Sequence, residues 1–125
     1  MTQEKLTLEG LRALALGASQ TPCEVCAPLQ CPGWDSMPAG FERALLRQVA
    51  TLRDEDSEHA TLLEHHPKGT TGWSVDAPIS PAHFPYNRCE VWQCTGCTRL
   101  FLRYTEYGGY YVDERIRALN PEAIV

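Results

Sequence analysis

The sequence predicts an α+β fold with two helices, a three-stranded antiparallel sheet and long loops. Apolar residues recur at helical spacing in two N-terminal segments, and a β-rich stretch lies near the C-terminus. Prolines and glycines fill the segments between them. A chain of 125 residues is typical of one domain. We therefore expect a single domain with a helical N-terminal part (1–66), a loop (67–88) and a sheet (89–117).

The two predicted helices cover residues 6–18 and 38–53. In the first, Leu8, Leu11 and Ala15 fall on one face. The second contains an apolar series at spacings of four, four and three, formed by Phe41, Leu45, Val49 and Leu52. Such spacing is typical of a helix that buries one face in a core.

The predicted strands cover about 89–94, 98–107 and 110–117, which are rich in β-branched and aromatic residues. Gly108-Gly109 is a two-residue turn signal between the last two strands. A turn of that length places Arg103 directly opposite Glu114 on the neighbouring strand, where the two form an ion pair.

Two long segments, 20–40 and 67–88, are predicted as loops. The first contains three prolines and three cysteines between positions 21 and 34, so it stays ordered only if a metal or another contact fixes it. The second is interrupted by proline or glycine every few residues, and loops of this length are often functional. The acidic run 54–58 is predicted to be a solvated turn.

Four cysteines occur as two C-x-x-C pairs. Cys23 and Cys26 lie in the first loop, and Cys94 and Cys97 lie between two predicted strands. Two intervening residues let both sulfurs of a pair turn towards one point, and tetrahedral Zn²⁺ takes four ligands. Gly96 eases the tight backbone inside the second pair. We therefore expect these four cysteines to bind one structural Zn²⁺.

The two pairs resemble the knuckles of zinc-ribbon domains, in which two knuckles hold one structural zinc under a small antiparallel sheet. The resemblance covers the four cysteines and the strands around the second pair, at the level of the fold. Sixty-seven residues lie between Cys26 and Cys94, more than in a typical ribbon, so a helix and a long loop are inserted between the knuckles. Ala27 and Thr98 stand where glycine often follows a knuckle.

The sequence also allows other ligand sets. Cys31 follows Cys26 by five residues in a loop, so it can replace one of the four thiolates, as can a histidine. Cys89 precedes Cys94 by five residues, and an odd separation on a regular strand places the two side chains on opposite faces. Four cysteines also suit iron, although nothing else in the sequence indicates electron transfer.

The cysteines are expected to be reduced and the protein cytoplasmic. Glu4 and Glu9 stand where a signal peptide would be basic and then apolar. No stretch approaches the roughly 18 apolar residues that a membrane span needs. In a reducing compartment, C-x-x-C pairs favour a metal over disulfides.

The net charge of −5 argues against a nucleic-acid ligand. Four thiolates with one Zn²⁺ add about −2, and such a chain is repelled by phosphate backbones. However, tyrosines and arginines are interleaved between Arg103 and Arg117, and aromatic residues among arginines can stack on single-stranded bases. A single-stranded nucleic-acid binder is therefore one hypothesis, although a half-buried sheet has the same composition.

The leading hypothesis is a non-enzymatic zinc-binding module that contacts another protein, in a regulatory role. Four cysteines close the coordination shell, whereas a catalytic zinc keeps an open position and usually has histidine ligands. An enzyme with a site in the loop around His65, His66 and His83 is the remaining hypothesis, because histidine changes charge near neutral pH. It is less favoured, since the sequence has no nucleophile elbow, phosphate-binding loop or H-E-x-x-H motif.

Overall fold

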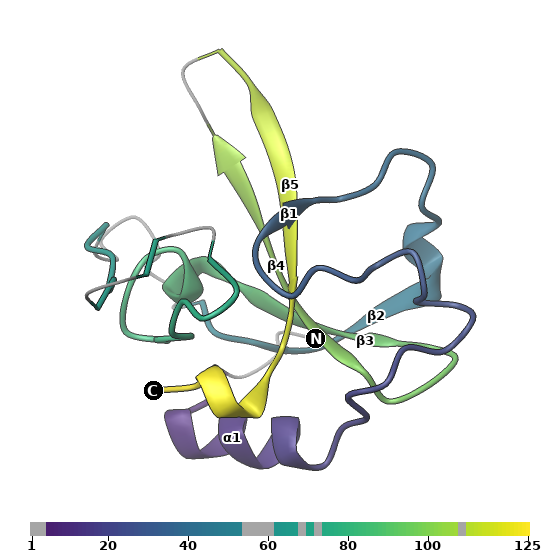
Figure 1. Ribbon diagram of the computed structural model, residues 1–125, viewed down its shortest axis with the longest axis horizontal. Helices are drawn as coiled ribbons and strands as arrows, with labels where there is room; N and C mark the ends of the chain where they lie inside the picture. The colour runs from purple at the N-terminus through teal and green to yellow at the C-terminus, as the bar shows by residue number, and fades with distance from the viewer. Residues whose placement is uncertain (1–4, 54–61, 68–69, 72–73, 108–109) are drawn as a thin grey trace.

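Five strands form one antiparallel sheet in the order β1-β5-β4-β3-β2 within the part of the chain that the computed structural model describes (Figure 1). That part comprises residues 5–53, 62–67, 70–71, 74–107 and 110–125. The strands are β1 (Asp35–Ser36), β2 (Leu46–Thr51), β3 (Glu90–Cys94), β4 (Leu100–Tyr107) and β5 (Val112–Ala118). The helical elements are α1 (Leu8–Leu16) and the short 3₁₀ segments η1 (Arg43–Leu45), η3 (Tyr86–Arg88) and η4 (Pro121–Ala123).

The predicted fold class is wrong, because the described chain is a mostly β fold with one α-helix and five strands. The predicted helix over 38–53 is replaced by η1 and β2. Its apolar spacings of four fit a strand as well as a helix, since a strand repeats every two residues. β2 also shifts register against β3 between Gln48 and Ala50, and this bulge moves later side chains to the other face. Pairing with β3 therefore decides the conformation.

The strand β1 was also missed by the sequence reasoning. Asp35 and Ser36 lie in the segment 20–40 that was predicted as a loop, but they pair with Ile116 and Arg115 of β5. A two-residue strand has no periodicity from which it could be recognised.

The remaining elements match their predictions. α1 begins at the N-cap Thr7, whose side-chain oxygen accepts from the backbone N–H of Gly10 at 3.0 Å, and it buries Leu11 and Ala15. The three C-terminal strands are confirmed as β3, β4 and β5.

The register of β4 on β5 differs from its prediction by two residues. Tyr107 pairs with Val112, and Thr105 pairs with Glu114. A shift of two keeps every side chain on its predicted face. Arg103 therefore still forms an ion pair with Glu114, now from a diagonal position. The predicted Gly108-Gly109 turn and the acidic run 54–58 lie outside the described residues.

Both faces of the sheet are covered. We call the first the helix face, where α1, η4 and the segment 75–89 pack against Val91, Leu100 and Leu102. The second is the cysteine face, where the segment 23–46 packs against Phe101 and Ile116. Because both faces are buried, three consecutive residues of β4, Leu100 to Leu102, are each at most 1% exposed. No helix among the described residues is long and apolar enough to span a membrane.

Candidate metal centre

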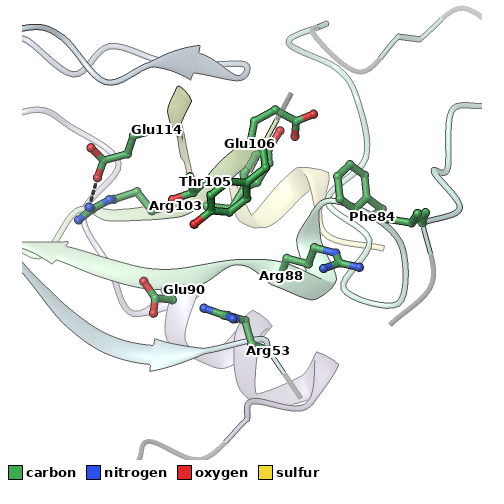
Figure 2. Close-up of a pocket in the computed structure, with 11 residues that line it drawn as sticks. Arg53, Phe84, Arg88, Glu90, Arg103, Thr105, Glu106 and Glu114 are labelled. Carbon is green, nitrogen blue, oxygen red and sulfur yellow. Dashed lines mark hydrogen bonds and ion pairs between the residues drawn. The ribbon is translucent and has the colours of Figure 1, made fainter. Parts of the chain in front are cut away.

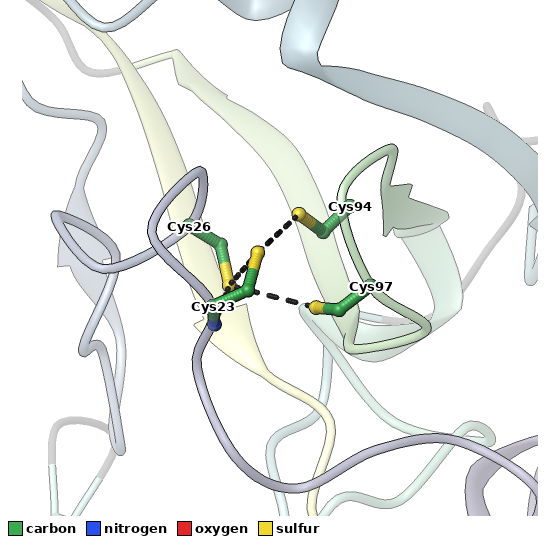
Figure 3. Close-up of side chains that lie close together, drawn as sticks. All are labelled: Cys23, Cys26, Cys94 and Cys97. Atoms are coloured by element: carbon green, nitrogen blue, oxygen red, sulfur yellow. Dashed lines mark hydrogen bonds between the residues drawn. The ribbon is translucent and has the colours of Figure 1, made fainter.

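The two cysteine pairs face each other across the cysteine face of the sheet (Figure 3). Cys23 and Cys26 lie in the loop that follows α1, and the backbone N–H of Leu29 closes its turn onto the carbonyl of Cys26 at 2.8 Å. Cys94 ends β3 and Cys97 lies in the turn before β4, where the N–H of Cys94 bonds to the carbonyl of Arg99 at 3.0 Å. Each pair is therefore held by its own tight turn.

The four sulfurs lie within 4.8 Å of one another. Neighbouring Sγ atoms are 3.9 Å apart for Cys23 and Cys26, 3.6 Å for Cys23 and Cys94, and 3.8 Å for Cys26 and Cys97. A tetrahedron whose centre lies about 2.3 Å from each sulfur has edges of about 3.8 Å. All four cysteines are free thiols in the structure. The spacing is therefore that of four ligands around one metal ion.

Backbone N–H groups also point at the sulfurs. The N–H groups of Cys23, Gly96 and Arg99 donate to the sulfurs of Cys26, Cys94 and Cys97, each at 3.4 Å. Such hydrogen bonds stabilise negative charge on sulfur and fix the direction in which it points. The two turns therefore supply both the sulfur ligands and backbone N–H groups that stabilise negative charge on three of those sulfurs.

Gly96 is required by close packing between the two knuckles. A Cβ at this position would lie 2.7 Å from Val25 Cγ2 and 3.1 Å from Cys23 Sγ. Real Cβ atoms do not approach other atoms so closely, so a side chain would push the first knuckle away from the second. Sequence reasoning assigned Gly96 to backbone freedom, and the structure adds this contact with Val25.

Arg99 was missed by the sequence reasoning, and it joins the two halves of the centre. Its guanidinium donates to the carbonyls of Leu29 at 2.6 Å and Gln30 at 3.2 Å, and it lies 4.8 Å from the ring centroid of Phe101. Arg99 is itself 7% exposed, so these hydrogen bonds hold a buried cation. The available signal was an arginine two residues after the last cysteine of the second knuckle.

The thiols differ in how readily they ionise in the absence of a metal. The backbone N–H of Cys26 lowers the pKa of Cys23 to about 7, with a further contribution from the Cys94 thiol. Burial raises the pKa of Cys94 to about 12, and burial also raises the pKa of Cys97. A metal that binds here must therefore displace protons.

The two remaining cysteines lie outside the cluster. Cys89 is fully buried on the helix face, on the opposite side of the sheet from Cys94, as the odd separation of the two residues predicted. Its thiol donates to the carbonyl of Pro85 at 3.4 Å. Cys31 is buried on the cysteine face but does not belong to the group that can hold a metal. Burial raises the pKa of both thiols, that of Cys31 to about 12. Both therefore remain neutral at physiological pH.

The histidines do not form a second metal site among the residues that the structure describes. The rings of His65 and His83 stack with centroids 5.2 Å apart, and His66 pairs with the nearby Glu64 at 2.9 Å. The Nδ1 atom of His83 lies 2.6 Å from the hydroxyl oxygen of Ser80. Two imidazoles therefore meet in the 64–88 loop, but the four-cysteine group is the candidate metal site.

The comparisons with known proteins identify no family. No protein-family profile matches the chain, and no curated protein or solved structure is similar enough to indicate a relative. Conclusions about the centre therefore depend on its geometry and chemistry.

Proposed function

We propose that the protein is a small zinc-binding module whose Cys23, Cys26, Cys94 and Cys97 hold one structural Zn²⁺. The observation that carries this proposal is the set of Sγ distances of 3.6, 3.8 and 3.9 Å between neighbouring cysteines of the cluster. Four thiolates prefer zinc or iron over hard cations such as Mg²⁺ and Ca²⁺. We favour zinc because the site is a closed tetrahedral set, typical of structural zinc.

The proposed role of the metal is to tie the two halves of the cysteine face together. Between α1 and β1, the loop with Cys23 and Cys26 contains no helix or strand. It is supported by Arg99, which donates to the carbonyls of Leu29 and Gln30, and by the N–H of Ala118, which donates to the carbonyl of Cys31. Zinc sites in small domains contribute on the order of 10 kcal/mol to folding at pH 7. That amount is comparable to the whole stability of a domain.

We further propose that this module is non-enzymatic, acts in the cytoplasm and binds another protein. For the binding of another protein, the support is the β4–β5 hairpin, which extends past the other strands (Figure 1). Four large apolar residues near its tip are exposed: Tyr107, Tyr110, Tyr111 and Val112. Exposed aromatic residues of this kind are enriched in protein interfaces.

The structure gives less support to a nucleic-acid interface. On the sheet, Arg117 is buried, Arg103 pairs with Glu114 and stacks on Trp92, and Arg115 pairs with Asp113. Guanidinium groups that are engaged within the protein contribute little to phosphate binding. We therefore place the protein-interaction role ahead of the single-strand-binding role.

The experiment that tests the structural role is removal of the metal from the purified full chain. We expect a strong chelator to lower the melting temperature and to abolish the amide-exchange protection of the 20–36 loop and of residues 94–99. Restoring one equivalent of Zn²⁺ should restore both. A metal-free chain with unchanged melting temperature and unchanged protection would contradict the proposal.

A further inference from the structure

The outer edge of β4 is open beyond the end of β3. The β3–β4 pairing ends with Glu90 opposite Arg103, whereas β4 continues to Tyr107 and pairs with β5 over that additional length. Within the described chain, residues 104–107 therefore have a neighbouring strand on one side alone. An unpaired edge of this kind can accept another strand.

The backbone groups on this open side can be identified. In an antiparallel pair, successive residues direct their N–H and C=O groups alternately to the two sides of the strand. The carbonyl of Glu114 accepts from the N–H of Met37, so Glu114 points away from β4. Its partner Thr105 therefore points away from β5, and so does Tyr107 two residues later. Thr105 and Tyr107 thus present two donors and two acceptors to the open side.

A cavity of about 420 Å³ follows the same edge (Figure 2). Five consecutive residues of β4, from Arg103 to Tyr107, line it. Side chains alternate between the faces of a strand, so five successive residues share one cavity only where the cavity runs along the strand's edge. Leu62, Phe84 and Arg88 form another part of the lining, and Leu62 is exposed. The remaining lining residues are charged: Arg53, Glu90 and Glu114. The space therefore combines free backbone groups with a few apolar side chains and with charged residues of both signs.

We propose that this cavity binds an extended peptide segment of a partner protein, which adds to β4 as a further strand. This inference rests on the proposed function of the chain as a protein-interaction module. Main-chain hydrogen bonds to Thr105 and Tyr107 supply affinity, and side chains of the peptide supply specificity. Apolar side chains of the segment contact Leu62 and Phe84.

Charge specifies one position of the peptide. Glu106 lies directly opposite Asp113 in the β4–β5 pairing, and it makes no ion pair with another described residue. Asp113 accepts from Ser36 and Arg115. Arg115 is also within electrostatic reach of Glu106, so Glu106 is the less engaged acid of this pair rather than an isolated one. The segment therefore carries lysine or arginine beside Glu106, where an opposite charge stabilises cross-strand pairing.

The same residue argues against a second copy of this chain as the occupant. Two copies that pair antiparallel through both Thr105 and Tyr107 would place the two Glu106 side chains directly opposite each other. Like charges in that position are destabilising. A heterologous basic segment avoids this repulsion.

The test uses the zinc-loaded full chain and random twelve-residue peptides displayed on phage. We expect enriched peptides to alternate apolar residues with a lysine or arginine. A synthetic copy of such a peptide should protect the amides of Thr105 and Tyr107 from hydrogen exchange.

Variants of the chain test the backbone contact directly. Thr105→Pro removes the backbone N–H on the open side and should abolish binding. Thr105→Ala keeps this N–H and should bind within about twofold of the unchanged chain. Glu106→Lys should weaken binding at least about tenfold, and the control Glu122→Lys should not.

Several outcomes would overturn the inference. These are a failure to enrich any peptide, amides of Thr105 and Tyr107 that stay unprotected, and a correctly folded Thr105→Pro or Glu106→Lys chain that binds normally. Protection of the same amides that rises with concentration in the free chain would identify a second copy as the occupant and would also overturn it. The zinc content of the same sample is measured separately. Failure of the structural-zinc proposal would appear there as a chain without metal, whatever the peptides do.

Discussion

The Sγ atoms of Cys23 and Cys94 lie 3.6 Å apart although 71 positions separate the two residues in the chain. A metal bound at this point would close a very long loop and would constrain the unfolded chain as well as the folded one. It would also fix the segment 23–46 to the cysteine face, where that segment covers Phe101 and Ile116. A bound metal would thus stabilise the cysteine face, the part of the core against which no α-helix packs.

Gly96→Ala should weaken zinc binding without removing a ligand. The added Cβ would lie 2.7 Å from Val25 Cγ2, so the two knuckles must separate. Changes next to metal ligands typically cost about 10- to 100-fold in affinity, and competition with a chromophoric chelator measures this loss. Adding Val25→Ala removes the closest atom, so the double variant should recover part of the affinity. An unchanged affinity in Gly96→Ala would refute the close packing between the knuckles.

Tyr86→Phe should destabilise the protein by about 1 to 3 kcal/mol. The Tyr86 hydroxyl accepts from the guanidinium of Arg117 at 2.5 Å and from Trp34 Nε1 at 3.2 Å. Arg117 is 1% exposed, so losing this acceptor leaves part of a buried cation without a partner. Urea denaturation measures the free energy of unfolding.

The matched control for this prediction is Tyr107→Phe. Tyr107 is 78% exposed, so removal of its hydroxyl should change the free energy of unfolding by less than about 0.5 kcal/mol. Equal effects of the two substitutions would show that the buried hydroxyl contributes nothing specific.

Arg117 also donates to the carbonyls of Val75 and Ala77. Because Tyr86→Phe removes one acceptor of the Arg117 guanidinium, it should also increase amide exchange in the 75–89 segment.

Zinc affinity should fall as the pH falls. Burial raises the pKa of Cys94 to about 12 and raises that of Cys97, so both thiols carry protons at neutral pH until a metal displaces them. Protons and metal compete for the same sulfurs, and each displaced proton weakens binding about tenfold for every unit by which the pH decreases. With both of these thiols losing a proton, the dissociation constant should therefore rise about a hundredfold between pH 7 and pH 6. A dissociation constant independent of pH would contradict the assignment of thiol ligands.

The sequence predicted the cysteine cluster and four of the six α and β elements. The spacing of the C-x-x-C pairs was informative because two intervening residues leave few ways for both sulfurs to converge. α1 was recognised from apolar residues at helical spacing, and β3, β4 and β5 from their β-branched and aromatic composition and the turn signal before β5. The ion pair of Arg103 with Glu114 was also confirmed, although the register behind it was wrong by two residues.

The rest could not be predicted because long-range contacts decide it. β2 has an apolar pattern that suits a helix, and its pairing with β3 is visible only once the fold brings the two segments together. Arg99 and Arg117 fall within predicted strands and received no structural role, yet both bind backbone carbonyls from segments far away in sequence. The two-residue turn signal predicted Tyr107 opposite Tyr110, whereas Tyr107 pairs with Val112, so four positions rather than two separate the paired strand ends.

The most direct test of the central claim is the metal content of the freshly purified chain, compared with Cys94→Ser and Cys31→Ser. The account predicts one Zn²⁺ per unchanged chain, none in Cys94→Ser, and one in Cys31→Ser, since Cys31 lies outside the cluster. Elemental analysis gives the stoichiometry, and a thermal melt on the same samples reports whether the fold depends on the metal. A metal-free unchanged chain, or a Cys94→Ser chain that keeps its full zinc content, would contradict the account.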